Sequence, residues 1–271
     1  MNRRILALVT LTTLSFASVA ISDPIQVSSS VAARPESSVV VPVQEVASSP
    51  SFLDHLEDIY DAADLKEAGL SIDVFRKAAV GYYNLQQQNK LNKNKDILSV
   101  IDFTKSSREK RLWIIDLNKR KVLYNSLVAH GQGSGDDMAV NFSNIENSHM
   151  SSLGFYVTSH TYQGKHGLSL KLQGLDQGFN SNAFQRAIVV HGADYVSEAF
   201  VKQHGRLGRS HGCPALPPEI TPAVIQLIKG GTCLYINGPA ANYQSAFLNT
   251  DTAIKTFEKE IIAQQAKLLG K

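Results

Sequence analysis

Apolar positions recur at helical spacing in two stretches near the start of the chain. The first stretch follows Ser51-Phe52-Leu53-Asp54, which resembles a capping box, and continues with Leu56, Ile59, Tyr60 and Ala63. A second stripe begins at Ser71 and fades in the polar run from Gln86 to Lys95; its members are Ile72, Phe75, Ala79, Tyr82 and Leu85. The pattern predicts a small helical cap over residues 51–95.

From Ile97 onward the apolar positions form short runs instead of helical stripes. The runs cover residues 97–103, 112–117, 122–129, 153–159, 168–173, 187–191 and 232–237, with turns rich in Gly, Ser and Asn between them. Many short strands favour a β-sandwich or barrel over a Rossmann sheet. Helical spacing returns at 220–228 and at 253–269. We therefore predict a mainly β fold with helices over residues 96–240, followed by a C-terminal amphipathic helix within 241–271.

The first 50 residues are predicted to form an export signal followed by a linker to the folded part. Arg3 and Arg4 precede an apolar run from Ile5 to Ala20, and Ser18-Val19-Ala20 supplies small residues before a cleavable bond. This is typical of a secretory signal peptide over residues 1–20. A retained membrane anchor is the alternative, although the run is shorter than the roughly 20 apolar residues a span needs. Residues 21–50, rich in Ser, Val and Pro, predict an extended linker. We expect an exported protein of the periplasm or cell envelope, without stable membrane insertion after cleavage.

Composition excludes several classes of protein. At 271 residues, 43% hydrophobic and 19% charged, the chain is neither disordered nor collagen-like. Its formal net charge of +3 includes Arg3 and Arg4 of the predicted leader, so the mature chain is close to neutral and has no footprint for nucleic acid. Two cysteines, Cys213 and Cys233, are too few for a disulfide framework, and neither belongs to a Cys-x-x-Cys pair.

Reactive residue types are densest between Ile188 and Pro214. An apolar strand ends in His191-Gly192, and His211-Gly212-Cys213 follows after a helix-like segment. A nucleophilic thiol needs a base and donors for the oxyanion that forms. We expect His191 to take the proton of Cys213, and the resulting ion pair to lower the pKa of the thiol. The amides of Gly212 and Cys213, with His211 beside them, are expected to hold the oxyanion.

At these residues the sequence closely resembles the L,D-transpeptidase catalytic domain (YkuD-like) family, in its murein L,D-transpeptidase catalytic domain branch. The family signature is a histidine, a spacer and then Ser/Thr-His-Gly-Cys, which here are His191 and Ser210 to Cys213. The branch resemblance extends over Ile97 to Asn237 and includes Arg111-Leu112-Trp113-Ile114-Ile115-Asp116-Leu117 and Val128-Ala129-His130-Gly131. After Cys213 the chain has Pro214-Ala215, where better-studied members carry an apolar residue and then Asn or Arg.

The resemblance implies a β-sandwich-like catalytic fold and a cysteine enzyme that acts on bacterial peptidoglycan. In the family the cysteine attacks the bond after the L-centre of diaminopimelate in a tetrapeptide stem. It then releases the terminal D-Ala and passes the acyl group to an amine of another stem. By position, Cys213 matches the nucleophile, His191 the base, and His211 and Gly212 the oxyanion side. No metal or organic cofactor is implied.

Three other residues form a predicted substrate-binding group. Arg206 and Arg209 could hold a carboxylate of the stem peptide, because guanidinium binds carboxylate bidentately, or they could be exposed solubilising charges. Ser210 of the signature completes this group.

The sequence leaves several alternatives open. Cys213 could pair with Cys233 in a disulfide, or a metal could bind to His191, His204, His211 and Cys213. Ser107-Arg108-Glu109-Lys110 matches the Ser-x-x-Lys motif of penicillin-binding enzymes and is interpreted as chance. Four turn histidines are expected to be exposed more often than to line a cleft: His130, His149, His160 and His166. For function, the alternatives are an L,D-carboxypeptidase that uses water, and a non-catalytic envelope protein that binds peptidoglycan or a partner.

Overall fold

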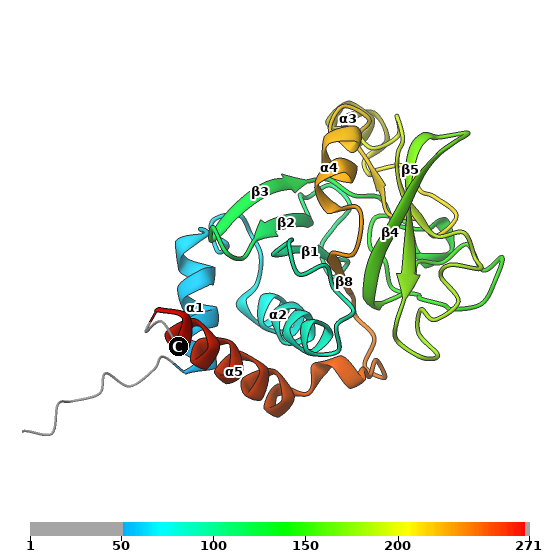
Figure 1. Cartoon of the computed structure of the whole chain (residues 1–271). Coiled ribbons are helices and arrows are strands. Elements are labelled where there is room, and N and C mark those ends of the chain that lie inside the picture. The colour runs from blue at the N-terminus through cyan, green and yellow to red at the C-terminus, as the bar shows by residue number, and fades with distance from the viewer. Residues whose placement is uncertain (1–50, 269–271) are drawn as a thin grey trace, which may run out of the picture. The chain divides into compact units, whose positions relative to one another are not determined.

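Figure 1 shows a computed structural model of the chain, which describes residues 51–268. The predicted signal peptide and linker lie outside the described residues, as does the final residue of the helix predicted for 253–269. In residues 51–268, no helix combines the length and the apolar character that crossing a membrane requires.

Three helices gather on one side of the fold (Figure 1): α1 (Phe52–Ala62), α2 (Ile72–Gln87) and α5 (Thr250–Leu268). The capping box predicted at Ser51 is confirmed, because the hydroxyl of Ser51 accepts from the Asp54 N–H and the Asp54 carboxylate accepts from the Ser51 N–H, both at 3.2 Å. Helix α2 begins directly after Ser71, as the pattern predicts. Phe257 of α5 packs against Phe52 of α1, with ring centroids 5.6 Å apart.

The described strands form one mixed sheet in the order β3-β2-β1-β8-β4-β5-β6-β7. Their bounds are β1 (Ile97–Asp102), β2 (Leu112–Asp116), β3 (Lys121–Ser126), β4 (Gly154–Gly164), β5 (Gly167–Gly174), β6 (Val189–Gly192), β7 (Ala215–Leu216) and β8 (Cys233–Asn237). The β1–β8 and β6–β7 pairs are parallel, and the other pairs are antiparallel. The predicted mainly β fold is confirmed.

The two ends of this strand order approach each other. The chain that leaves β3 forms isolated bridges from Ala129 to Ala215 in β7 and from Gly131 to Ser210. The sheet is therefore nearly closed, and the bridges lie against the segment that carries the His-Gly-Cys sequence. The sequence did not predict β7, because a strand of two residues shows no periodicity.

The sheet has an apolar core on each face. Along β1, Leu98 and Val100 pack against the helices, whereas Ile97 and Ile101 belong to a second core with α4 (Thr221–Ile228), as alternation along a strand requires. Helix α2 approaches the sheet closely at Gly81, where a Cβ atom would lie 2.0 Å from the ring of Phe155. The remaining helix, α3 (Glu198–His204), precedes the His-Gly-Cys turn.

Candidate active site

His191 lies on β6, and Cys213 lies just before β7, the strand that pairs with β6. The two strands pair in parallel with His191 opposite Ala215, two residues after Cys213. The Sγ atom of Cys213 accepts a hydrogen bond from the Val189 N–H at 3.4 Å and donates one to the Ala187 carbonyl at 3.7 Å. The sheet therefore holds the thiol against the strand that carries the histidine.

The imidazole of His191 has a defined tautomer. Its Nδ1 lies 2.9 Å from the Gly192 carbonyl oxygen, which can only accept a hydrogen bond. The neutral ring therefore carries its proton on Nδ1 and presents an unprotonated Nε2. His191 is buried, and burial lowers its pKa, with further lowering from the neighbouring His166 and Lys165. A neutral ring with a free Nε2 can accept a proton.

The turn from Ser210 to Cys213 is held together by the Ser210 hydroxyl. This hydroxyl accepts from the Gly212 N–H at 3.0 Å and donates to the Cys213 carbonyl at 2.6 Å. Gly212 has a φ of 121°, which side-chain-bearing residues rarely adopt, and a Cβ atom there would lie 2.7 Å from the Met150 carbonyl oxygen. The turn thus requires glycine, and it places Ser210 inside the turn as a buried residue.

Arg186 lies beside this turn and was not singled out from the sequence. Its Nη2 donates to the Met150 carbonyl at 2.7 Å, and its Nη1 donates to the Ser143 carbonyl at 2.7 Å. The same Nη2 lies 3.3 Å from the Cβ position at Gly212. No motif marks Arg186, because its position depends on how residues 143–152 fold back over the turn.

The thiol and the imidazole are both shifted toward their neutral forms. Burial raises the pKa of Cys213, and the Val189 N–H and the charge of Arg186 oppose that rise. Burial also lowers the pKa of His191. Within residues 51–268, no hydrogen bond joins Sγ to the His191 ring. The expected lowering of the thiol pKa by a thiolate–imidazolium pair is therefore wrong for this structure, because desolvation disfavours both charged forms.

The backbone amides near the thiol differ in availability. The Gly212 N–H donates to Ser210, whereas the Cys213 N–H makes no hydrogen bond with any residue that the structure describes. The ring of His211 stacks on that of His149, with centroids 4.2 Å apart and planes 9° apart. Of the two amides expected to hold an oxyanion, the Cys213 amide is the free one, and the His211 ring packs on that of His149.

Arg206 and Arg209 both face a carboxylate of the protein itself. Arg209 Nη1 donates to Asp136 Oδ1 at 2.7 Å and to the Gly135 carbonyl at 2.9 Å. Arg206 Nε lies 3.9 Å from the same Asp136 oxygen, and its Nη1 donates to the Leu207 carbonyl. Both arginines are half-buried, so neither is a fully exposed solubilising charge.

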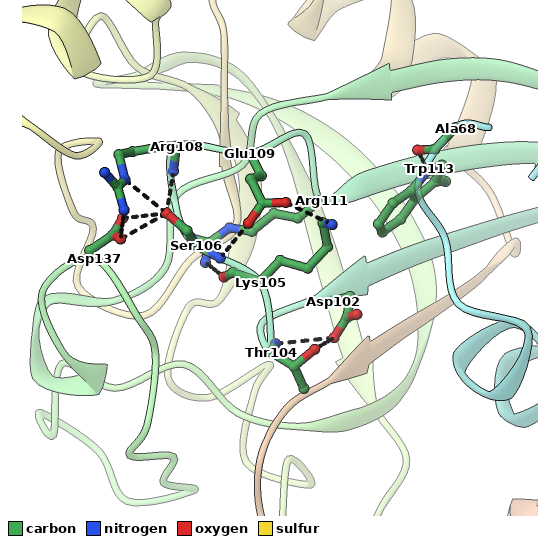
Figure 2. Close-up of polar contacts among 10 residues, drawn as sticks. All are labelled: Ala68, Asp102, Thr104, Lys105, Ser106, Arg108, Glu109, Arg111, Trp113 and Asp137. Carbon is green, nitrogen blue, oxygen red and sulfur yellow. Dashed lines mark hydrogen bonds and ion pairs between the residues drawn. The ribbon is translucent and has the colours of Figure 1, made fainter. Parts of the chain in front are cut away.

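A polar network around Asp137 fixes the loop between β1 and β2 (Figure 2). This loop contacts the segment that leads into the His-Gly-Cys turn. The carboxylate of Asp137 accepts from the Ser106 hydroxyl and pairs with Arg108, as Figure 2 shows. It also accepts from the Ser107 hydroxyl at 2.8 Å. Ser107 also accepts from the Leu207 N–H at 3.1 Å. In the Ser-x-x-Lys match, Ser107 thus joins three chain segments, which is a structural arrangement.

Buried Arg111 stabilises the same loop through hydrogen bonds. It donates to the carbonyls of Lys105 and Val128 and to Nδ1 of His130 at 2.8 Å. His130 is 1% exposed, so the expectation that it is an exposed turn residue is wrong. Burial, followed by the charge of Arg111, lowers the pKa of His130 to about 4. The sequence shows the Gly-rich surroundings of His130 but not its arginine partner.

Neither open alternative for the cysteines is present in the described structure. Cys213 and Cys233 are both free, and Cys233 is buried in β8. Among residues 51–268, no group of three or more His, Cys, Asp or Glu side chains is arranged to hold a metal ion. His204 is the last residue of α3 and is not part of the turn from Ser210 to Cys213.

A hollow of about 530 Å³ adjoins His191. Its lining includes His166, Gly192, Asp194 and Tyr195. The ring of His166 stacks on that of His191, with centroids 4.5 Å apart. His166 is exposed and also lines this hollow, so both interpretations of this residue hold in part.

A nearly closed mixed sheet, in which the signature histidine lies on β6 and the signature cysteine precedes β7, is the type of fold that the signature implies. The model of the L,D-transpeptidase catalytic domain family matches residues 66–237, which is more than half of the chain. The protein therefore belongs to this family.

Solved structures of low sequence identity are similar to the chain. They include an L,D-transpeptidase from Mycobacterium smegmatis (12% identity, TM-score 0.33, covering 52% of this chain and 58% of that one). Another is the helical cell shape determining protein from Campylobacter jejuni (13% identity, TM-score 0.37, covering 68% and 64%). The chain thus spans less than two thirds of the length of these proteins. No curated protein matches the sequence significantly.

Proposed function

We propose that the protein is a cysteine-dependent peptidoglycan L,D-transpeptidase. The observation that supports the proposal is the pairing of β6, which carries His191 with an Nε2 free to accept a proton, with β7, which begins two residues after Cys213; the Cys213 thiol is hydrogen-bonded to Val189 of β6. The thiol proton passes to His191 as Sγ bonds to the acyl carbon of a tetrapeptide stem. The bond from that carbon to the terminal D-Ala nitrogen then breaks, and His191 returns the proton to the leaving amine.

The neutral resting pair suits this sequence of steps. Because burial disfavours a separate thiolate, the proton leaves as the S–C bond forms and negative charge moves to the substrate oxygen. In the proposed reaction the Cys213 N–H, which makes no hydrogen bond within residues 51–268, donates to that oxygen, and losing such a donor typically costs about 2.7–4 kcal/mol of barrier. Arg186 adds positive charge on the same side of the turn.

The hollow beside His191 is the proposed approach for the acceptor amine. It carries Lys165 and Asp194, which offer partners for the carboxylate and ammonium groups of a second stem. In this arrangement His191 takes a proton from the amine that attacks the thioester. If water attacks instead, the product is a trimmed stem and the protein acts as an L,D-carboxypeptidase. An exported protein of the periplasm or envelope is part of the proposal, because peptidoglycan lies there.

The proposal is tested by intact mass after exposure to a disaccharide-tetrapeptide donor. Wild type and Cys233→Ala are expected to gain an acyl adduct and to release D-Ala, whereas Cys213→Ala gains none. Cys233→Ala is the matched control, because it leaves Cys213 as the sole thiol. Adding an acceptor stem then separates transfer from hydrolysis. A folded wild-type protein that forms no adduct would support the non-catalytic binding alternative and overturn the proposal.

A further inference from the structure

A second hollow, of about 510 Å³, adjoins the His-Gly-Cys turn through Met150. Met150 lines this hollow, and its carbonyl oxygen accepts from Arg186 and lies 2.7 Å from the Cβ position at Gly212. Met150 therefore links this hollow to the turn that carries Cys213. The hollow has no part in the proton transfers proposed above.

The lining of this hollow is polar without being charged. Three asparagines, Asn141, Asn144 and Asn242, contribute to it, and every lining residue in the described structure is uncharged. By contrast, the hollow beside His191 carries Lys165 and Asp194. A charged stem peptide is therefore poorly matched to the uncharged hollow.

Two of the asparagine amides are free to bind a ligand. Asn141 and Asn242 are exposed, and within residues 51–268 their side chains make no hydrogen bond. Asn144 is instead held by Ser181 and Asn182. Each free amide offers two donors and an acceptor oxygen, which is the complement of hydroxyl and acetamido groups.

Fixed aromatic rings supply the apolar part of the lining. Phe142 stacks on Phe103, with centroids 6.4 Å apart, and Phe179 meets Tyr243 edge-on at 5.1 Å, so both rings are held in place while remaining partly accessible. The loop that carries Phe142 also exposes Ile145, which is 72% accessible. Exposed apolar side chains beside unpaired amides are typical of a ligand-binding surface.

We propose that this hollow binds an N-acetylated sugar of the glycan strand, next to the stem whose acyl group passes to Cys213. The inference rests on the proposed function. A pyranose ring presents C–H groups on its faces, which pack on Phe142 or Phe179, and hydroxyl and acetamido groups at its edge, which pair with Asn141 and Asn242. Once D-Ala has left, three stem residues separate the acyl carbon from the sugar, a reach of about 10 Å when extended. The sugar is thus expected in an adjoining hollow and not at the turn itself.

The experiment compares two donors, the disaccharide-tetrapeptide and the free tetrapeptide, by the rate at which Cys213 is acylated over a range of donor concentrations. In wild type, the disaccharide donor is expected to half-saturate at a concentration about tenfold lower. In the double variant Asn141→Ala/Asn242→Ala, the two donors should half-saturate alike, and acylation by the free tetrapeptide should be unchanged. Asn118→Ala, an exposed asparagine of the β2–β3 turn, is the matched control and should keep the tenfold difference.

The outcomes separate this inference from the proposed function. If both donors acylate wild type equally well, the sugar site is overturned and the transpeptidase proposal stands. If neither donor acylates wild type, the proposed function fails, and binding of chitotetraose to Cys213→Ala decides the nature of the hollow. The sugar site is supported if chitotetraose binds, if the asparagine double variant loses that binding, and if cellotetraose, which lacks acetamido groups, does not bind. Absence of chitotetraose binding overturns it.

Discussion

Replacing Gly212 by alanine tests whether backbone geometry at the turn controls the reactivity of Cys213. The added Cβ would lie 2.7 Å from the Met150 carbonyl oxygen, 3.1 Å from Ile188 Cδ1 and 3.3 Å from Arg186 Nη2. The first of these contacts is shorter than real Cβ atoms tolerate, and a carbonyl oxygen held by Arg186 cannot swing away as a side-chain tip would. The turn must shift instead.

The size of the effect follows from two terms. A non-glycine residue at a φ of 121° carries backbone strain of about 1–3 kcal/mol, which lowers the free energy of unfolding by a similar amount. Relief of the contact then moves the Cys213 amide and thiol by a fraction of an ångström. Misplacement approaching 1 Å typically costs about 100-fold in rate. We therefore expect acylation of Gly212→Ala to slow by roughly 30- to 100-fold.

The matched control is Gly205→Ala at the C-terminus of α3. Gly205 also has a positive φ, of 73°, but no atom lies within 4 Å of its Cβ position. It should lose about 1 kcal/mol of stability and keep its acylation rate. The assays are urea unfolding and single-turnover acylation followed by intact mass. If Gly212→Ala acylates within about threefold of Gly205→Ala, the turn geometry does not set reactivity and the reasoning fails.

Three further predictions concern residues around the turn. Arg186→Gln should raise the pKa of Cys213 further, seen as a shift to higher pH in its rate of alkylation, whereas Arg186→Lys should shift it less; an unmoved profile in the glutamine variant would contradict the charge effect. The pKa of His130 is about 4 in the folded chain and about 6.5 when unfolded, so its contribution to stability is present above pH 6.5 and is lost as the pH falls toward 4. Urea unfolding should show wild type losing about 3 kcal/mol more than His130→Gln over that range, and parallel curves would refute the assignment. Trp113→Phe removes the hydrogen bond from Nε1 to the Ala68 carbonyl, visible in Figure 2, and should lower the free energy of unfolding by about 1–3 kcal/mol without changing acylation; a neutral effect on unfolding would show that water replaces the bond.

The fold could be predicted where local pattern is strong. Apolar stripes at helical spacing predicted α2 and α5 to within three residues, and the capping box at Ser51 was recognisable from its polar residues alone. The strand β7 escaped prediction because its two residues are defined only by their partners, His191 and Gly192. The near closure of the sheet escaped for the same reason, since it depends on isolated bridges between distant segments.

The candidate site shows a similar division. The order of His191 and Cys213 along the chain, and the glycine between His211 and Cys213, are local features that indicated a thiol site. Arg186 could not be found this way, because its partners lie 34 to 43 positions earlier in the chain. The direction of the Cys213 pKa shift was also out of reach, because desolvation depends on packing that a linear pattern does not contain.

The raised pKa of the Cys213 thiol has a consequence for the exported transpeptidase proposed above. Thiolates are the reactive form toward oxidants and disulfides, so a thiolate held permanently at an accessible edge would be vulnerable in an oxidising compartment. Here burial raises the pKa of the Cys213 thiol. Two groups stabilise the thiolate and so oppose that rise: the Val189 N–H of β6, and Arg186, which donates to the Ser143 carbonyl of a neighbouring loop. The proposed acylation then depends on a substrate whose carbonyl oxygen takes the negative charge as the S–C bond forms. The same burial that disfavours the thiolate therefore makes the proposed reaction depend on a carbonyl placed beside the Cys213 amide, which ties protection of the proposed nucleophile to specificity for its donor.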